Sequence, residues 1–273
     1  MALAVDQSRN EIDWDHAVVR FLELEGKLAS EFPAAIEEAE DLAANLTDPR
    51  TANADAVWAR AWNKPLYAHT KVKIADRMVE KLRPCVDGAW LRWGIKGGDQ
   101  FYISKIGKGV DETAFETTPL AQSVRQKTGI AWYRLFAIQG AAGALRARDL
   151  RSKTPYADLV GVDPGVTVPL VRSEMGPFWG YITVLHFFTD LGLGCKPDVH
   201  LTKTVHCLGM ITDLKTKEPP SLTDAITINR HVRCLVEKLE GCVLPERMRH
   251  FDKVQRMRYV DKVLMEISKN KLI

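Results

Sequence analysis

Apolar residues recur three and four positions apart along most of the chain, and runs that alternate apolar with polar residues are scarce. Leu201, Val205 and Leu208 show this spacing, which places side chains on one face of a helix. We therefore expect an all-α protein. The expected helices cover residues 11–29, 33–46, 66–82, 129–150, 168–174, 222–240 and 247–269, with one more starting just after Pro177 and another at Pro197-Asp198.

Glycine and proline mark where these helices should end. Pro84 is expected to stop the third helix, and Gly192-Leu193-Gly194 to end the one that starts after Pro177. The glycine-rich, basic stretch 94–112 predicts an exposed excursion. By contrast, Gly140-Ala141-Ala142-Gly143 lacks bulk, so residues 129–150 are predicted to form a central, buried helix.

The chain of 273 residues is long enough for a single unit or for two helical lobes that bury a full core without metals or disulfides. Its five cysteines are odd in number and lack short paired spacings, as expected where thiols stay reduced. No apolar run approaches the roughly 20 residues that span a bilayer. The opening MALAVDQSRN does not resemble a secretion signal, so we expect a cytoplasmic (nucleoid-associated) or nuclear protein without membrane contact.

Charge is distributed unevenly along the chain. Residues 1–56 hold 13 Asp/Glu against 4 Lys/Arg, a balance of −9, so the net charge of +3 leaves +12 for residues 57–273. Such an excess attracts a polyanion to the later part of the chain. The alternative is that these basic residues only solvate helix faces, and composition does not separate the two interpretations.

The most informative segment is 174–210, EMGPFWGYITVLHFFTDLGLGCKPDVHLTKTVHCLGM. It predicts a helix end at Gly176, an apolar helix, a glycine stop, and a new helix that begins at Pro197-Asp198. Backbone N–H groups at a helix start would favour and hold the ionised form of Asp198. Taken alone, an aspartate at this position is usually only an N-cap, so the order and spacing of the whole segment carry the functional interpretation.

The segment resembles the helix-hairpin-helix DNA glycosylase superfamily in the order and spacing of its helices and glycines. Asp198-Val199-His200 stands where that family often has a D-x-H sequence. This group includes endonuclease III and the adenine, alkyladenine and 8-oxoguanine glycosylases. The resemblance is specific over residues 174–210 and implies a helix-hairpin-helix and catalytic segment at 168–210 within a bilobed, all-α fold. It also implies that Asp198 is catalytic: cleavage of an N-glycosidic bond builds positive charge on the sugar, which a fixed carboxylate stabilises while it activates water.

The resemblance implies contacts with DNA as well. The hairpin at Met175-Gly176 and the helix start at Phe178 would bind the phosphate backbone, together with Lys196 and Lys203. Pro177 departs from the family pattern, which has two glycines flanking an apolar residue, and it removes one N–H donor. A flipped-out base needs aromatic or apolar walls, for which the candidates are Trp132, Tyr133, Trp179, Tyr181 and His200. Each of these aromatic residues has core packing as its alternative role.

Family members that also cut the strand carry a lysine about 18 residues before the aspartate, where this chain has Trp179, Gly180 and Tyr181. The resemblance therefore implies a monofunctional glycosylase, unless a lysine from elsewhere, such as Lys105 or Lys108, reaches the pocket. We expect a monomer that acts on double-stranded DNA with a damaged or modified base and needs no metal or organic cofactor. Three alternatives stay open: an anti-phage glycosylase for hypermodified viral bases, a non-catalytic helix-hairpin-helix DNA-binding protein, and a helical enzyme for a small molecule.

Overall fold

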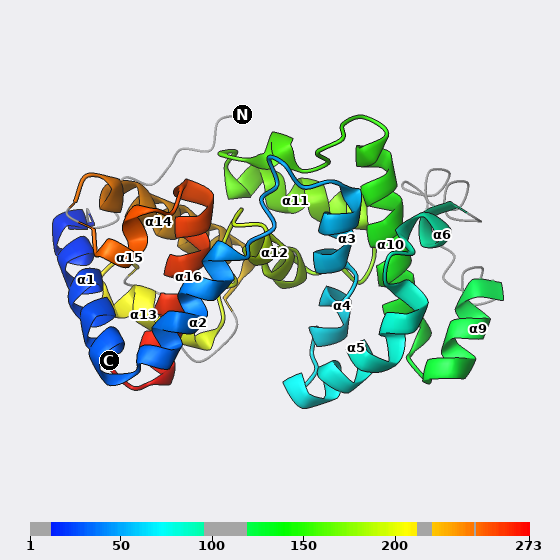
Figure 1. The fold of residues 1–273 in the computed structure, drawn as a ribbon, viewed down its shortest axis with the longest axis horizontal. Coiled ribbons are helices and arrows are strands. Elements are labelled where there is room, and N and C mark those ends of the chain that lie inside the picture. Colours follow the sequence, from blue (N-terminus) through cyan, green and yellow to red (C-terminus); the bar gives the residue numbers. More distant parts are fainter. Residues whose placement is uncertain (1–11, 96–118, 212–219, 243) are drawn as a thin grey trace. The chain divides into compact units, whose positions relative to one another are not determined.

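The fold was obtained as a computed structural model that describes residues 12–95, 119–211, 220–242 and 244–273 (Figure 1). The described residues form helices and turns and contain no β-strand, so the expected all-α class is confirmed for this part of the chain. The chain divides into two compact units. Unit 1 joins residues 1–43 to residues 197–273, and unit 2 comprises residues 44–196.

Unit 2 is organised around α10 (Trp132–Asp149), the predicted central helix. Its Gly140 and Ala142 are buried, and α3, α4, α6, α9 and α11 all pack against it (Figure 1). The other elements of unit 2 are α3 (Ala54–Ala61), α4 (Lys64–Tyr67), α5 (Val72–Val86), α6 (Trp90–Ile95), α9 (Pro119–Thr128), the 3₁₀ turn η1 (Ala157–Leu159), α11 (Pro164–Met175) and α12 (Tyr181–Asp190). The small residues of α10 therefore lie where neighbouring helices approach closely.

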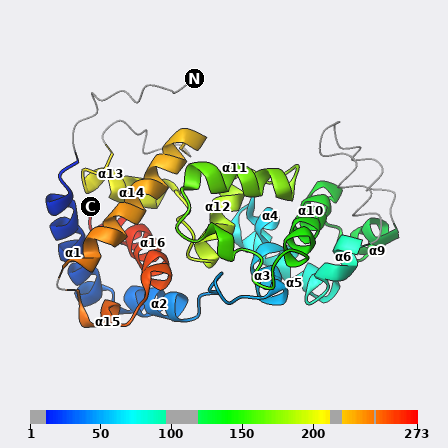
Figure 2. The same cartoon turned by 90° about the horizontal axis from the view of Figure 1, so that it is seen from above.

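Unit 1 pairs the two N-terminal helices with the C-terminal ones. Its elements are α1 (Trp14–Glu31), α2 (Pro33–Ala44), α13 (Val199–Cys207), α14 (Leu222–Glu240), α15 (Glu246–Arg249) and α16 (Lys253–Lys269). The long helix α16 packs against α1, α13 and α14 (Figure 2). Helices from the two ends of the chain therefore share one core.

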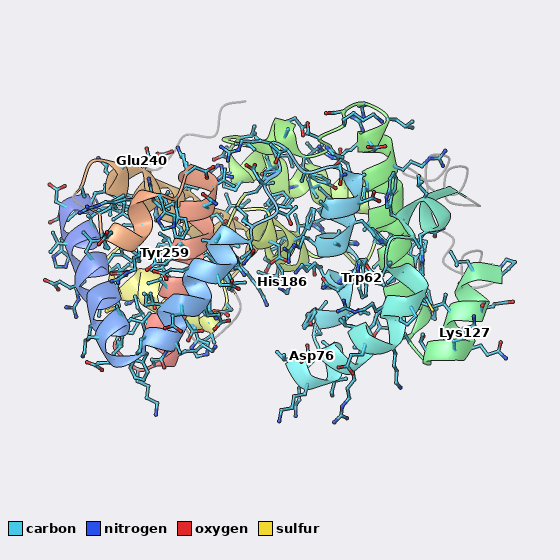
Figure 3. The ribbon with its side chains drawn as sticks, viewed as in Figure 1. Trp62, Asp76, Lys127, His186, Glu240 and Tyr259 are labelled. Atoms are coloured by element: carbon cyan, nitrogen blue, oxygen red, sulfur yellow. The ribbon has the colours of Figure 1, made fainter. Side chains whose placement is uncertain are left out.

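A charged group sits inside that core. Glu25 of α1 is only 1% exposed, and its carboxylate accepts hydrogen bonds from the Arg247 guanidinium (2.6 and 3.1 Å) and from the Tyr259 hydroxyl (2.7 Å). Burial, with Glu25 close by, raises the pKa of Tyr259, so its hydroxyl stays protonated and donates. Figure 3 labels Tyr259 on α16. The network links α1, α15 and α16 through one buried carboxylate.

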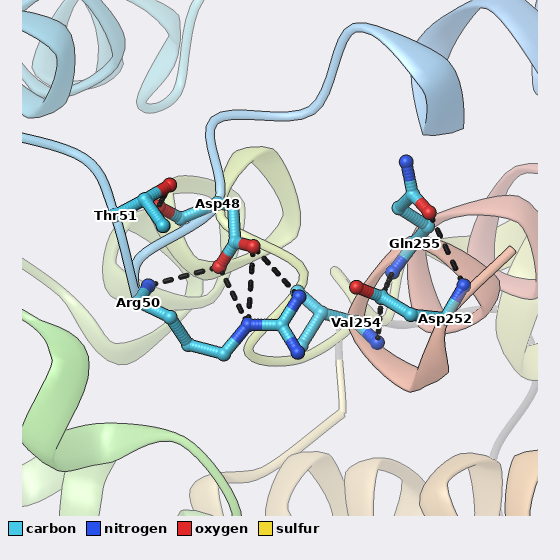
Figure 4. Close-up of polar contacts among 6 residues, drawn as sticks. All are labelled: Asp48, Arg50, Thr51, Asp252, Val254 and Gln255. Carbon is cyan, nitrogen blue, oxygen red and sulfur yellow. Dashed lines mark hydrogen bonds and ion pairs between the residues drawn. The ribbon is translucent and has the colours of Figure 1, made fainter.

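Several predicted helix boundaries were wrong, and local chemistry explains them. The segment 247–269 is two helices, because Asp252 accepts hydrogen bonds from the N–H groups of Val254 and Gln255 (2.8 and 2.9 Å) and the Gln255 side chain accepts one from the Asp252 N–H (3.1 Å). This capping box begins a new helix, α16, at Lys253 (Figure 4).

In unit 2, the Asp48 carboxylate forms an ion pair with the Arg50 side chain in the turn after α2 (Figure 4).

Two more boundaries differ in unit 2. Pro84 was expected to stop a helix over 66–82, but it lies inside α5, which continues to the fully buried Val86. A proline in the last turn removes a single hydrogen bond, and burial of Val86 offsets that loss. Residues 66 and 67, at the start of the predicted segment, belong to the separate short helix α4, and α5 begins only at Val72. The helices α3, α6 and α9 were not predicted at all.

Candidate active site

Asp198 is the N-cap of α13, as the sequence predicted. One carboxylate oxygen, Oδ1, accepts hydrogen bonds from the backbone N–H groups of His200 (2.9 Å) and Leu201 (3.0 Å). For the other oxygen, Oδ2, the described residues provide no hydrogen-bond donor, and the side chain is partly exposed. The backbone thus fixes the carboxylate through one oxygen and leaves the second for a ligand or water.

The glycine stop before Asp198 works as predicted. α12 ends at Asp190, and Gly192 has φ 63°. The N–H of Leu193 donates to the carbonyl of Phe188 (2.9 Å), and the N–H of Gly192 to that of Thr189 (3.2 Å). This pair of bonds is a Schellman motif, which ends a helix and turns the chain away.

The other two predicted residues of unit 1 lie on α13. The His200 ring nitrogen Nδ1 is 3.3 Å from the Ser268 hydroxyl of α16, so its ring is held against the neighbouring helix. Lys203 is exposed. The remaining predicted site residues belong to unit 2, because the boundary between the units falls between Lys196 and Pro197.

The hairpin region consists of α11 and α12, which pack together and are joined by residues 176–180. α11 was predicted over 168–174 but begins at Pro164, because Asp163 caps it by accepting from the Gly165 N–H (2.8 Å). α12 was predicted to start just after Pro177 but begins at Tyr181, so Phe178 lies in the connection before the helix and not at its start. Met175 is 1% exposed, and its side chain belongs to the core.

The residues before α12 bring three predicted site residues together. The Phe178 ring lies 5.8 Å from the Trp132 ring, 5.7 Å from that of Tyr133 and 6.2 Å from that of Phe136 (centroid distances). Phe178 and Tyr133 are 41% and 38% exposed. We call Trp132, Tyr133, Phe136 and Phe178 the aromatic patch. Tyr133 and Phe178 present its ring surface to solvent beside the connection between α11 and α12, whereas Phe136 is only 1% exposed.

The other two aromatic candidates are placed differently. Trp179 is 1% exposed and donates its indole N–H to the Ala137 carbonyl (2.7 Å), so it is a core residue rather than an open wall for a base. Tyr181 is the first residue of α12 and is half-buried. Chain position alone did not separate Phe178 from Trp179, because their burial is decided by packing against α10.

Phe178 adopts φ 67°, a left-handed conformation that is costly for a bulky residue. We predict that Phe178→Gly is at least as stable as Phe178→Ala, because glycine relieves this cost of roughly 1–2 kcal/mol. At exposed Leu170 inside α11 the order should be the usual one, with glycine about 1 kcal/mol less stable than alanine. Urea unfolding of the four variants measures both differences. A Phe178→Gly protein less stable than Phe178→Ala by a similar margin would show that the backbone is not strained there.

Two polar groups in unit 2 escaped prediction because their partners are distant in sequence. Arg134 donates to the carbonyls of Pro65 (2.9 Å) and Leu66 (2.7 Å) and to the Thr70 hydroxyl (2.7 Å), which ties the start of α10 to α4. Lys64, 5% exposed, forms an ion pair with Asp190 at the end of α12. Both support the helices that carry the aromatic patch.

Beside this ion pair lies a tyrosine with a raised pKa. The Tyr67 hydroxyl donates to Asp76 (2.9 Å), and its ring makes an edge contact with His186 (5.7 Å between centroids; Figure 3 labels Asp76 and His186). Burial, with the Asp76 carboxylate adding to it, raises the pKa of Tyr67 to about 12. At neutral pH this hydroxyl is therefore a hydrogen-bond donor and not a base.

The described residues contain no group of three or more His, Cys, Asp or Glu side chains placed to hold a metal ion. None of the helices in this part of the chain has an apolar stretch long enough to cross a bilayer. The alternative lysines Lys105 and Lys108, and most of the predicted loop 94–112, lie outside the described residues. Comparison of the chain with known protein families, curated proteins and solved structures gave no match.

Proposed function

We propose that this protein is a monofunctional DNA glycosylase that flips a damaged or modified base out of the duplex and hydrolyses its N-glycosidic bond with Asp198. The observation that carries the proposal is the Asp198 carboxylate, which two backbone N–H groups hold through Oδ1 while Oδ2 stays available. A carboxylate fixed in this way is already oriented before substrate binds, so it stabilises the cationic sugar without further reorganisation.

The roles of the groups follow from the chemistry of the reaction. As the bond from sugar to base lengthens, positive charge develops on the deoxyribose, and the negative charge of Asp198 stabilises it. The same carboxylate accepts a proton from the attacking water. The products are the free base and an abasic site. Trp179, Gly180 and Tyr181 provide no amine for a Schiff base, so the proposal includes no strand cleavage.

Two features of unit 2 support a DNA partner. Unit 2 carries 21 Lys/Arg and 14 Asp/Glu, a balance of +7, whereas unit 1 carries 17 and 21, a balance of −4. The basic charge is thus concentrated in one unit, which also presents the aromatic patch, and exposed aromatic rings stack readily on unpaired bases.

A panel of duplexes tests the proposal. Each carries one target: an alkylated purine, 8-oxoguanine, adenine opposite 8-oxoguanine, uracil, or a glucosylated 5-hydroxymethylcytosine of the kind found in viral DNA. We expect release of free base from at least one duplex and strand breaks only after alkali. Breaks without alkali would contradict the monofunctional assignment. DNA binding without release of any base across the panel would favour a non-catalytic DNA-binding protein.

A further inference from the structure

The helix α5 carries three cations in a line that the proposed reaction does not use. Lys73, Arg77 and Lys81 follow one another at intervals of four residues, and all three side chains are exposed. We call these three residues the cation line. Four residues of α-helix rise about 6 Å and rotate the side chain by only about 40°, so the three charges lie on one side of the helix.

The opposite side of α5 is anchored in unit 2. Ala75, Val79, Leu82 and Val86 are buried, and α5 packs against α4 and α9. This packing fixes the direction in which the cation line points. The line is therefore a rigid surface of unit 2 and not a set of charges on a loop.

No carboxylate of the described residues forms an ion pair with the cation line. Among the described residues, Lys73, Arg77 and Lys81 form no ion pair or side-chain hydrogen bond, whereas Lys64 and Arg148 of the same unit are paired. The neighbouring acid Asp76 on α5 accepts the Tyr67 hydroxyl at 2.9 Å instead. Glu80 lies three residues after Arg77 on α5 and is exposed, but it forms no ion pair with Arg77.

We propose that the cation line docks the phosphodiester backbone of duplex DNA, with each of its three side chains neutralising one phosphate. The proposal depends on the proposed function only for the choice of DNA as the polyanion. Regular anionic groups along a rigid backbone match a line of cations at fixed intervals, and exposed Lys and Arg are the usual partners of phosphate. Such contacts position the protein on DNA without reading its sequence.

The salt dependence of binding to an undamaged duplex tests this surface. Each phosphate contact contributes about 0.9 to the slope of log K against log salt, so the triple variant Lys73→Gln/Arg77→Gln/Lys81→Gln should lower the slope by about 2.7. At 0.1 M salt its affinity should fall on the order of 10²-fold. The matched control, Lys153→Gln/Lys238→Gln/Lys271→Gln, removes three exposed cations elsewhere. Its slope should differ from that of the wild-type protein by less than about 1.

Circular dichroism of both triple variants confirms that the helices are intact. Any of three results would overturn the proposal: a wild-type slope in the Lys73→Gln/Arg77→Gln/Lys81→Gln variant, an equal loss of slope in both triple variants, or a wild-type protein whose DNA binding does not depend on salt. So would binding to vesicles with anionic lipid, or to an RNA hairpin, that depends on the cation line while DNA binding does not. Because the duplex is undamaged, failure of base release leaves this result valid, and failure of the cation line leaves the proposed reaction standing.

Discussion

Replacing Asp198 with asparagine should lower the rate of base release by at least about 10²-fold while leaving the stability of the protein unchanged. Asparagine and aspartate are equally good N-caps, so the amide oxygen of the variant side chain still accepts the N–H bonds of His200 and Leu201. What the variant loses is the negative charge and the base that activates water. The loss of one preorganised electrostatic group typically costs about 10²–10³ in rate. Single-turnover release of free base, on whichever duplex the panel identifies, measures it.

A second variant separates the charge from the cap. Asp198→Ala removes both and should be less stable by about 1 kcal/mol, in addition to the loss of activity. As a control, Ser221 caps α14 by accepting the Asp224 N–H, and Ser221→Ala should lower stability by a similar amount without changing base release. If Asp198→Asn retained wild-type base release, Asp198 would be only an N-cap, and the proposed mechanism would be wrong.

The sequence predicted those parts of the fold whose cause is local. The start of α13 follows from Asp198, and the end of α12 from Gly192, because a cap and a left-handed glycine act within a few residues. The predicted spans of α1, α2, α10 and α14 agree with the structure to within three residues at each end. Helical spacing of apolar residues was sufficient for these long elements.

The remaining features depend on contacts that no local pattern contains. Phe178 and Trp179 are adjacent aromatics, yet one joins the exposed aromatic patch and the other the core. Lys64 and Asp190 are 126 residues apart in the chain. The spacing of apolar residues also does not predict that α1 and α2 pack with the C-terminal helices. It shows which face of a helix is buried but not which helix covers that face.

The buried carboxylate of unit 1 gives the largest expected effect on stability. Replacing Glu25 with alanine should lower the free energy of unfolding by about 3 kcal/mol, the lower end of the range for a broken buried ion pair. Arg247, whose side chain is 31% exposed, recovers part of its solvation in water. The Tyr259 hydroxyl lies on a fully buried residue and loses its acceptor, which alone costs about 1–3 kcal/mol. Urea unfolding followed by circular dichroism measures the loss.

Two comparisons decide whether the cost comes from the unpaired partners. Glu237 and Lys253 form an ion pair in the same unit with both side chains more than half exposed, and Glu237→Ala should change stability by less than about 0.5 kcal/mol. The triple variant Glu25→Leu/Arg247→Met/Tyr259→Phe removes every polar member of the buried network and should recover most of the loss caused by Glu25→Ala. If Glu25→Ala and Glu237→Ala cost the same, the carboxylate of Glu25 would be solvated in the native state. If instead the triple variant were less stable than Glu25→Ala, the network itself would hold α1 against α16, because apolar packing would have failed to replace its hydrogen bonds.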